Sequence, residues 1–144
     1  MSKKPPSWYN QSGVIPFRRK GCQVEVLLVT SSSQKRWIIP KGIVEPDLSP
    51  AESAAQEALE EAGVTGVVGT EPIGEYHYDK WGGTCIVAVY LLEVREVLET
   101  WQEGALRRRE WLSLADAQDR LSDQGLKRVF EALTPSDFTQ PEHS

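Results

Sequence analysis

Cysteine, methionine and histidine are scarce in this chain, and their scarcity excludes two classes of protein. Of the 144 residues, two are cysteine, one is methionine and two are histidine. Cys22 and Cys85 are isolated, so they offer neither a disulfide framework nor the ligand spacing of a zinc site. We expect two reduced, at least partly buried thiols in a cytoplasmic protein.

Long apolar runs and an excess of positive charge are missing as well. The longest apolar run, residues 85–92, is far too short to cross a bilayer and is typical of a buried strand. No apolar run follows the charged first residues, so we expect no signal peptide. The net charge of −5 disfavours non-specific binding to nucleic acid or anionic lipid. We therefore predict no nucleic-acid or membrane partner, and the oligomeric state stays open.

The remaining composition is that of one globular domain, with 40% hydrophobic and 26% charged residues. We expect a flexible arm over residues 1–12, the domain over 13–133 and a flexible tail over 134–144. Apolar patterns and turn residues predict strands over 13–17, 24–30, 36–39, 67–78, 84–94 and 108–112. Capping residues predict helices over 50–62, 113–121 and 124–133. This order is typical of an α/β domain with a mixed sheet.

The clearest local signal is the start of the first helix. Ser49 suits the N-cap, Pro50 the first helical position, and Glu52 is placed to close a capping box. Gly63 is a helix stop.

The C-terminal half of this helix carries an unfavourable acidic face. Glu57, Glu60 and Glu61 are spaced three and four apart, which places them on one side, and like charges there repel. The helix dipole also disfavours anions at this end, and residues 50–62 contain no Lys or Arg to offset them. One interpretation is a solvated acidic face. The other is a site for a hard divalent cation such as Mg²⁺, which takes oxygen ligands.

The spacing around these glutamates resembles the Nudix box. That pattern is Gly, five residues, Glu, seven residues, then Arg-Glu-aliphatic-any-Glu-Glu-any-Gly-aliphatic. The positions that match are Gly42, Glu57, Ala58, Glu60, Glu61, Gly63 and Val64. Leu48 stands where the pattern has its first Glu, and Gln56 where it has Arg. These two departures predict a different set of residues supporting the carboxylates.

Further stretches resemble the diphosphoinositol polyphosphate phosphohydrolase branch, which also hydrolyses diadenosine polyphosphates. They are residues 28–33, 36–40, 97–101 and 107–111. The resemblance implies a Nudix-type α/β/α sandwich that hydrolyses a phosphoanhydride bond with Mg²⁺, or Mn²⁺ in its place. It also implies metal ligands at Glu57, Glu60, Glu61 and the Lys41 carbonyl. Glu61 is the candidate general base, although family members differ in which Glu serves.

A polyphosphorylated substrate needs many cationic and hydroxyl donors. The predicted substrate-binding residues are Arg18, Ser31, Ser32, Ser33, Lys35, Arg36, Lys41, Gly42, Arg107 and Arg109. Arg19, Lys20, Lys80 and Arg108 are further basic candidates. An aromatic residue among Tyr76, His77, Tyr78 and Trp81 would suit stacking on an adenine.

Two alternatives stay open. The first is a Nudix hydrolase acting on nucleoside di- or triphosphates or on ADP-ribose. The second is a Nudix-shaped sensor without turnover, which Leu48 and Gln56 favour and the three helix glutamates oppose.

Overall fold

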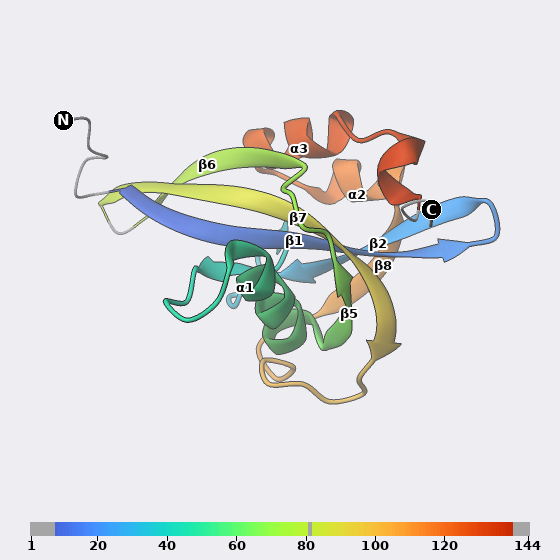
Figure 1. Cartoon of the computed structure of the whole chain (residues 1–144), viewed down its shortest axis with the longest axis horizontal. Coiled ribbons are helices and arrows are strands. Elements are labelled where there is room, and N and C mark those ends of the chain that lie inside the picture. Colours follow the sequence, from blue (N-terminus) through green and yellow to red (C-terminus); the bar gives the residue numbers. More distant parts are fainter. Residues whose placement is uncertain (1–7, 81, 140–144) are drawn as a thin grey trace.

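The computed structural model describes residues 8–80 and 82–139, and it places one mixed β-sheet between two groups of helices (Figure 1). The strands are β1 (Trp8–Lys20), β2 (Gln23–Thr30), β3 (Trp37–Ile38), β4 (Lys41–Ile43), β5 (Val64–Val68), β6 (Gly74–Lys80), β7 (Gly83–Val97) and β8 (Arg109–Ser113). The helices are α1 (Pro50–Glu57), the π-helical turn η1 (Ala58–Ala62), α2 (Leu114–Arg120), α3 (Gln124–Glu131) and the 3₁₀ turn η2 (Pro135–Phe138). α1 covers one face of the sheet, and α2 and α3 lie on the other, so the predicted α/β/α sandwich is confirmed.

Two long parallel strands, β1 and β7, form the spine of the sheet, with a register from Trp8↔Thr84 to Phe17↔Glu93. Each carries two different antiparallel neighbours along its outer edge. β1 pairs with β4 near Gln11 and with β2 from Phe17 onward. β7 pairs with β6 along its first half and with β5 along its second. β4 and β6 therefore flank the same end of the spine.

Helix α1 forms where its capping residues predict it. The Ser49 hydroxyl accepts from Glu52 N at 3.1 Å, and the Glu52 carboxylate accepts from Ser49 N at 2.9 Å, which closes the capping box. The face toward the sheet presents Ala54, Ala58 and Ala62, all fully buried. Because alanine is small, the helix backbone lies close to the sheet.

The predicted single helix over residues 50–62 needs one correction. The chain is α-helical only to Glu57, and Ala58–Ala62 form a π-helical turn that ends at Gly63 with φ of 68°. Apolar periodicity does not separate these two windings over five residues. Residues 41–43, which lie outside the predicted strands, form the short strand β4 against β1.

The opposite face of the sheet holds the larger side chains. Leu126 and Phe130 of α3 and Phe138 of η2 are each about 1% exposed. The rings of Phe17 and Phe138 meet edge to face, 5.0 Å between centroids. The prediction of a flexible tail from residue 134 is therefore wrong for residues 134–139, because burial of an aromatic ring anchors them. Residues 140–144 lie outside the described residues.

The predicted N-terminal arm is also shorter than expected. β1 begins at Trp8, and residues 8–12 pair with β7 and, in part, β4. Gln11 and Ser12 are buried, and each has a partner. Tyr78 Oη donates to Gln11 Oε1 at 2.7 Å, and Ser12 Oγ donates to Pro50 O at 2.7 Å. These bonds explain how a polar stretch enters the sheet. The predicted arm over residues 1–7 lies outside the described residues.

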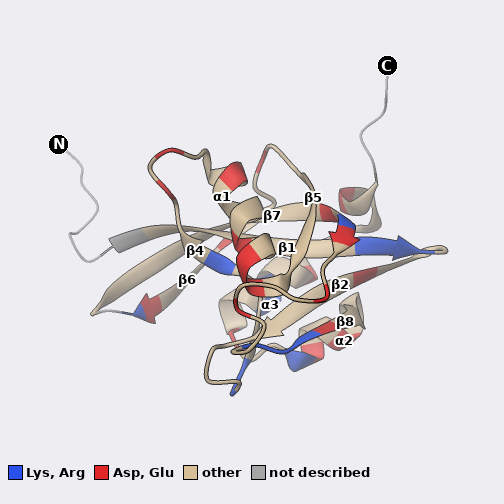
Figure 2. Ribbon diagram, turned by 90° about the horizontal axis from the view of Figure 1, so that it is seen from below, with Lys and Arg blue, Asp and Glu red and all other residues tan. Residues whose placement is uncertain are grey.

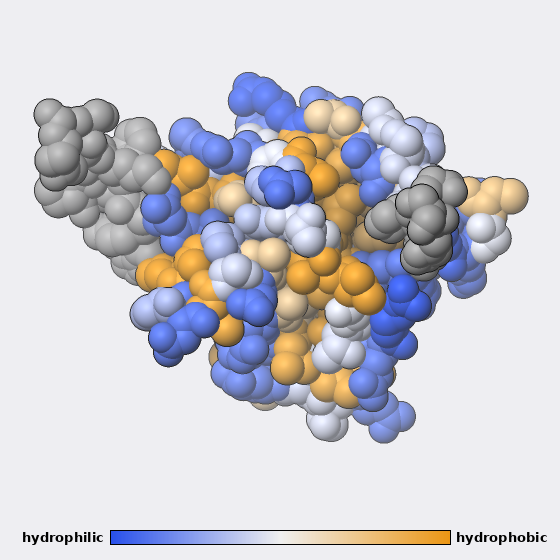
Figure 3. All heavy atoms as spheres, viewed as in Figure 1, coloured by the Kyte–Doolittle hydropathy of each residue, from blue (hydrophilic) through white to orange (hydrophobic). Residues whose placement is uncertain are grey.

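The surface mixes polar and apolar side chains (Figure 3). The large exposed apolar residues come from four different segments: Ile43, Val67, Val97 and Leu106. Among the described residues, no helix is long and apolar enough to cross a membrane. Both cysteines are free; Cys85 is buried as predicted, whereas Cys22 is exposed in the β1–β2 turn.

Candidate active site

A cleft of about 380 Å³ opens beside β4 and η1 and gathers most of the predicted site. Its walls come from β1, the 31–36 loop, β4, η1, β6 and the segment before β8. The residues that line it are Gln11, Ser31, Ser32, Ser33, Arg36, Ile38, Lys41, Gly42, Ile43, Glu61, Tyr78, Lys80 and Arg107. Eight of these were predicted from the sequence, although they are spread over 77 positions from Ser31 to Arg107. Acidic positions gather on α1 and the turn after it (Figure 2).

Glu61 is the carboxylate that faces this cleft. It is 6% exposed, and its Oε1 accepts a hydrogen bond from Lys41 N at 3.2 Å. Its Oε2 lies 3.5 Å from Arg107 Nη2. Burial raises the pKa of Glu61, while the positive charge of Arg107 opposes that shift. Glu61 is therefore a carboxyl group with an increased proton affinity, held in place from two sides.

Glu57 lies one turn earlier, with its carboxylate directly over Gly42. A Cβ built on Gly42 would stand 2.1 Å from Glu57 Oε2, so any other residue there would displace the Glu57 carboxylate. Burial, the charges of Glu61 and Glu60, and a hydrogen bond with Glu61 raise the pKa of Glu57 to about 8. Gly42 thus lines the cleft as predicted and also makes room for a carboxylate.

Glu103 belongs to the site and was not predicted. Its Oε1 accepts from Arg107 Nε at 2.7 Å, and its charge raises the pKa values of both Glu57 and Glu61. Arg107 also donates to Thr30 O at 2.9 Å and is only 12% exposed at its side chain. A lone Glu in an irregular loop gave no signal in the sequence, because only the folded loop brings it to the helix.

The basic side of the cleft is formed by the 31–36 loop and by the segment before β8, which carry Arg36 and Arg107. Ser31 N donates to Arg36 O at 2.8 Å, and Gln34 N donates to Ser31 O at 2.7 Å, which closes the 31–36 turn. Gln34 has a positive φ of 61° and its side chain donates to Leu106 O at 3.2 Å. Within the described residues, no carboxylate pairs with the exposed Arg36 guanidinium. Arg36 is therefore available to a ligand anion.

Lys41 occupies the centre of the cleft. Its Nζ stands 5.0 Å from the centre of the Tyr78 ring, a cation–π contact. Burial lowers the pKa of Lys41, and the neighbouring Glu61 opposes that shift. An arriving phosphate would add negative charge beside the ammonium and favour its charged form.

The carboxylates suit a hard divalent cation. Burial and mutual repulsion raise the pKa values of Glu57 and Glu61, and a cation between them would relieve both effects. Within the described residues, no three carboxylate, imidazole or thiol groups are already placed to hold a metal ion by themselves. Mg²⁺ can bind at such a site because it needs few protein carboxylates and takes water and substrate phosphates as its other ligands.

Comparison with known proteins agrees with this geometry. Residues 10–133 match the family described as the NUDIX domain.

The chain belongs to the Nudix family.

Its relatives are named as hydrolases. Nudix hydrolase 16, mitochondrial, from Arabidopsis thaliana is 38% identical over 124 residues, covering 74% of this chain and 68% of that protein. Diphosphoinositol polyphosphate phosphohydrolase 3-beta from Homo sapiens is 38% identical over 117 residues, covering 78% and 69%. This chain spans 58% to 68% of the length of four Arabidopsis Nudix hydrolases that it matches. Some relatives are named as mitochondrial or chloroplastic, so a cytoplasmic location stays a prediction.

A solved structure shares the fold. The Ap4A hydrolase of C. elegans superimposes with a TM-score of 0.69 at 21% identity, covering 85% of this chain and 93% of that one. Nudix hydrolases use divalent metal ions, in agreement with the carboxylate chemistry of this site.

The structure places both residues that depart from the Nudix box. Gln56, at the Arg position of the box, donates its amide to Glu60 Oε2 at 2.6 Å. Leu48, at the first Glu position, lies with Glu45, Asp47 and Glu57 along an acidic depression that is separate from the cleft. This Nudix domain therefore keeps Glu60 in place with a neutral donor.

Three predicted substrate-binding residues lie outside the cleft. Arg18 pairs with Glu25 at 2.8 Å near the far end of the β1–β2 hairpin and lies over the Trp111 ring. Lys35 is exposed and does not line the cleft. Arg109 turns away from it and binds backbone carbonyls at the end of η1. The strand predicted over 108–112 begins only at Arg109, and Arg107 lies in the segment before it.

A second cavity of about 310 Å³ adjoins the cleft and shares Arg36, Ile38, Lys41, Tyr78 and Lys80 with it. Its other walls are different in character: Tyr76, Leu126, Asp79 and Asp123. The rings of Tyr76 and Tyr78 stack 6.3 Å apart. Trp81, one of the aromatic residues considered for adenine stacking, lies outside the described residues, and His77 is exposed beside Glu75.

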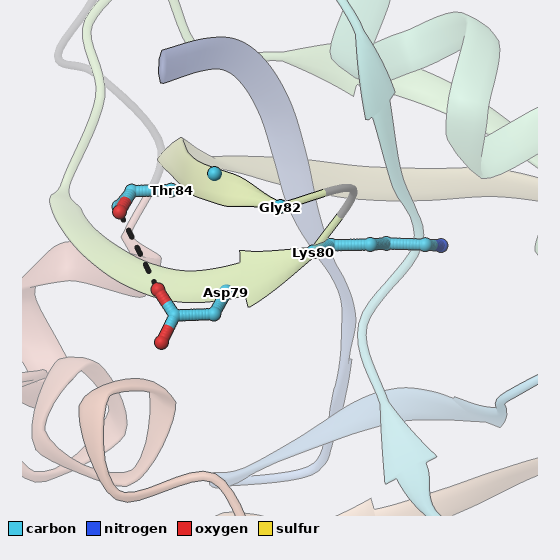
Figure 4. Close-up of a pocket in the computed structure, with 5 residues that line it drawn as sticks. Asp79, Lys80, Gly82 and Thr84 are labelled. Atoms are coloured by element: carbon cyan, nitrogen blue, oxygen red, sulfur yellow. Dashed lines mark hydrogen bonds between the residues drawn. The ribbon is translucent and has the colours of Figure 1, made fainter. Parts of the chain in front are cut away.

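The tip of the β6–β7 hairpin continues this second cavity (Figure 4). Thr84 Oγ1 donates to Asp79 Oδ1 at 3.4 Å, and Lys80 points away from Asp79. Asp79 lines the second cavity but not the cleft, whereas Lys80 lines both.

Proposed function

We propose that this Nudix protein hydrolyses a phosphoanhydride bond in a highly phosphorylated small molecule, with Mg²⁺ or, in its place, Mn²⁺. One observation carries the proposal: the cationic side chains of Arg36, Lys41, Lys80 and Arg107 line the same cleft as the buried carboxylate of Glu61. Such a cleft attracts polyphosphate and holds it against a group that can accept a proton.

Different residues bind the phosphates, accept the proton and hold the cation in the proposed reaction. Arg36 and the hydroxyl groups of Ser31 to Ser33 bind phosphate oxygens and orient the chain of phosphates. Glu61, whose proton affinity is increased by burial, accepts the proton of the attacking water. Glu57, Glu60 and the Lys41 carbonyl would hold the cation together with Glu61. When bound, the cation neutralises charge on the phosphates and lowers the pKa of the attacking water.

The adjoining cavity supports a substrate with an organic group next to its phosphates. Tyr76, Tyr78 and Leu126 suit a planar base, and Asp79 and Asp123 suit its amino hydrogens. Those two carboxylates would repel the many phosphates of an inositol pyrophosphate. We therefore place a diadenosine polyphosphate ahead of an inositol pyrophosphate. Nucleoside di- or triphosphates and ADP-ribose remain as the second candidate class.

The decisive experiment screens the purified protein with Mg²⁺ against diadenosine polyphosphates, inositol pyrophosphates, nucleotides and ADP-ribose. We expect turnover with the first group and product release as nucleotides. A matched Glu57→Gln variant should lose Mg²⁺ binding in calorimetry and most of its turnover. Hydrolysis of inositol pyrophosphates alone would overturn the choice of substrate but not the reaction.

The sensor alternative is separated by the same samples. A sensor would show a rise in melting temperature with metal and ligand, by mass action, but no product. Absence of Mg²⁺ binding in the presence of a non-hydrolysable polyphosphate analogue would contradict the proposed function as a whole.

A further inference from the structure

The turn that carries Glu60 and Glu61 ends at the left-handed Gly63, whose amide caps two of its carbonyl groups. The last carbonyl groups of a helix have no partner within it and need donors from outside. After the π-helical turn η1, only the carbonyls of Ala58 and Leu59 accept from the capping amide of Gly63. The next four carbonyls therefore depend on the rest of the molecule.

All four of these carbonyls are bound by the segment that runs from β7 to β8. Glu60 O accepts from Glu103 N at 3.0 Å and Gly63 O from Leu98 N at 2.8 Å. Glu61 O accepts from the indole of Trp101 at 2.9 Å, and Ala62 O from Arg109 Nη1 at 2.8 Å. Two side chains, Trp101 and Arg109, thus donate hydrogen bonds to backbone carbonyls that have no partner within the helix.

Trp101 and Arg109 act as one unit. The Arg109 guanidinium lies 3.9 Å from the centre of the Trp101 ring, and its Nη2 donates to Leu98 O at 2.5 Å. Gly63 makes room for both, because a Cβ there would stand 2.7 Å from Arg109 Nη1 and 2.8 Å from Trp101 Cβ. The guanidinium also puts a positive charge at the negative end of a helix that has no basic residue of its own in its last turn.

We propose that Trp101 and Arg109 are positioning residues that set the geometry of the metal-binding and proton-accepting carboxylates. Their bonds to Glu61 O and Ala62 O fix the backbone from which the Glu61 side chain projects. The same contacts anchor the loop that carries Glu103 and Arg107, whose side chains meet Glu61 in the cleft. Neither residue lines the cleft, so both act through the carboxylates. This inference rests on the proposed function.

The chain offers a matched control for the test. Trp111 lies under Arg18, 4.0 Å from ring centre to guanidinium carbon, so it forms a second arginine–tryptophan stack in the same sheet. Trp101 and Trp111 are both partly buried. Within residues 8–80 and 82–139, the carbonyls of Glu61 and Ala62 accept from Trp101 and Arg109 and not from Arg18 or Trp111, so loss of the Trp111 indole tests packing alone.

The experiment compares Trp101→Phe with Trp111→Phe. Phenylalanine keeps a ring under the guanidinium and removes the indole N–H donor. We expect Trp101→Phe to weaken Mn²⁺ binding, measured by calorimetry on the substrate-free protein, by about tenfold or more, and to lower kcat similarly. KM should rise less than kcat falls, because Arg36 and the hydroxyl groups of Ser31 to Ser33 are untouched and only the loop that carries Arg107 is loosened. Trp111→Phe should leave Mn²⁺ affinity, kcat and KM at the parental values.

A second variant keeps the test decisive if Trp101→Phe does not fold. Arg109→Lys retains the charge but cannot bridge two carbonyl groups with a planar fork, so it should show the same loss of Mn²⁺ affinity. Parental Mn²⁺ affinity and kcat in either folded variant, or an equal loss in Trp111→Phe, would overturn the positioning role. A parent protein that binds no divalent cation would overturn the proposed function, and this inference with it.

Discussion

The two faces of the sheet are built from different residues for different purposes. Under α1, the buried apolar helix residues are the alanines Ala54, Ala58 and Ala62. Under α3 and η2 they include Leu126, Phe130 and Phe138. Burial of large apolar side chains supplies far more free energy of folding than burial of alanine. The α3 face therefore stabilises the fold, while the alanines bring a helix backbone and its carboxylates close to the sheet.

The ends of the helices differ in the same way. α2 and α3 each have a basic residue in the last turn, Arg120 and Arg128, which favours the helix dipole. α1 and η1 have none and carry Glu57, Glu60 and Glu61 there. The gathered negative charge lowers the local stability of this helix end, and hydrogen bonds from distant residues offset that loss. Substitutions on the α1 face should thus affect activity, and those on the α3 face stability.

Glu61→Gln should give the largest effect on the α1 face. We expect kcat to fall by about 10²-fold or more, because the general base is lost. The unfolding midpoint without metal should change little, since removal of one like charge offsets the lost pair with Arg107. Glu131→Gln, at the end of α3, is the control and should leave kcat unchanged. Equal kcat values for both variants in a steady-state assay would remove the functional difference between the faces.

Phe130→Ala should give the largest effect on the α3 face. Loss of a fully buried aromatic ring costs about 3–5 kcal/mol of unfolding free energy. Denaturant titration measures this, and kcat at low temperature reports on the molecules that remain folded. We expect kcat per folded molecule to stay at the parental value. A folded variant with strongly reduced kcat would show that this face also positions the site.

Arg36→Ala should have a moderate effect that is confined to substrate binding. Its guanidinium is exposed and has no carboxylate partner among the described residues, so a charge-assisted bond to phosphate is its main interaction. Loss of such a bond, about 1.5–3 kcal/mol, corresponds to a rise in KM of roughly tenfold or more. Arg128→Ala on α3 is the control and should leave KM unchanged. Arg107→Ala should also raise KM, but its bonds to Glu61 and Glu103 predict a fall in kcat as well.

The last effect concerns pH. Burial and neighbouring carboxylates raise the pKa of Glu57 to about 8, above its usual 4.5, so the folded state holds this proton more tightly than the unfolded state. This contribution to stability is fully present below pH 4.5 and is lost as the pH rises through 8. The melting temperature of the metal-free protein should therefore fall relative to Glu57→Gln over this window. Parallel melting curves for the two proteins across pH would contradict the shift.

The sequence was sufficient to locate the acidic helix. The capping box at Ser49 and Glu52 depends on neighbours in the chain, so it can be derived from local rules. The repulsion of Glu57, Glu60 and Glu61 follows from helical spacing alone. The Nudix box added Gly42, although its tight approach to Glu57 became visible only in the structure.

Other parts of the site depend on contacts between distant segments. Glu103 reaches the carboxylates because η1 and the β7–β8 segment share hydrogen bonds. Arg107 and Arg109 are two residues apart and basic alike, yet one lines the cleft and the other binds carbonyls outside it. Sequence patterns describe the side chain but not the groups that surround it, so they could not separate these two roles.

The sequence by itself determined the family, the mixed α/β architecture and the helix that carries the carboxylates, because caps, periodicity and motif spacing are local. The tertiary structure alone decided the π-helical end of that helix, the burial of Phe138 and the division of the arginines. Each of these depends on partners more than thirty residues away, as when Trp101 binds the carbonyl of Glu61, 40 positions earlier. Such partners meet only when the strands between them have paired.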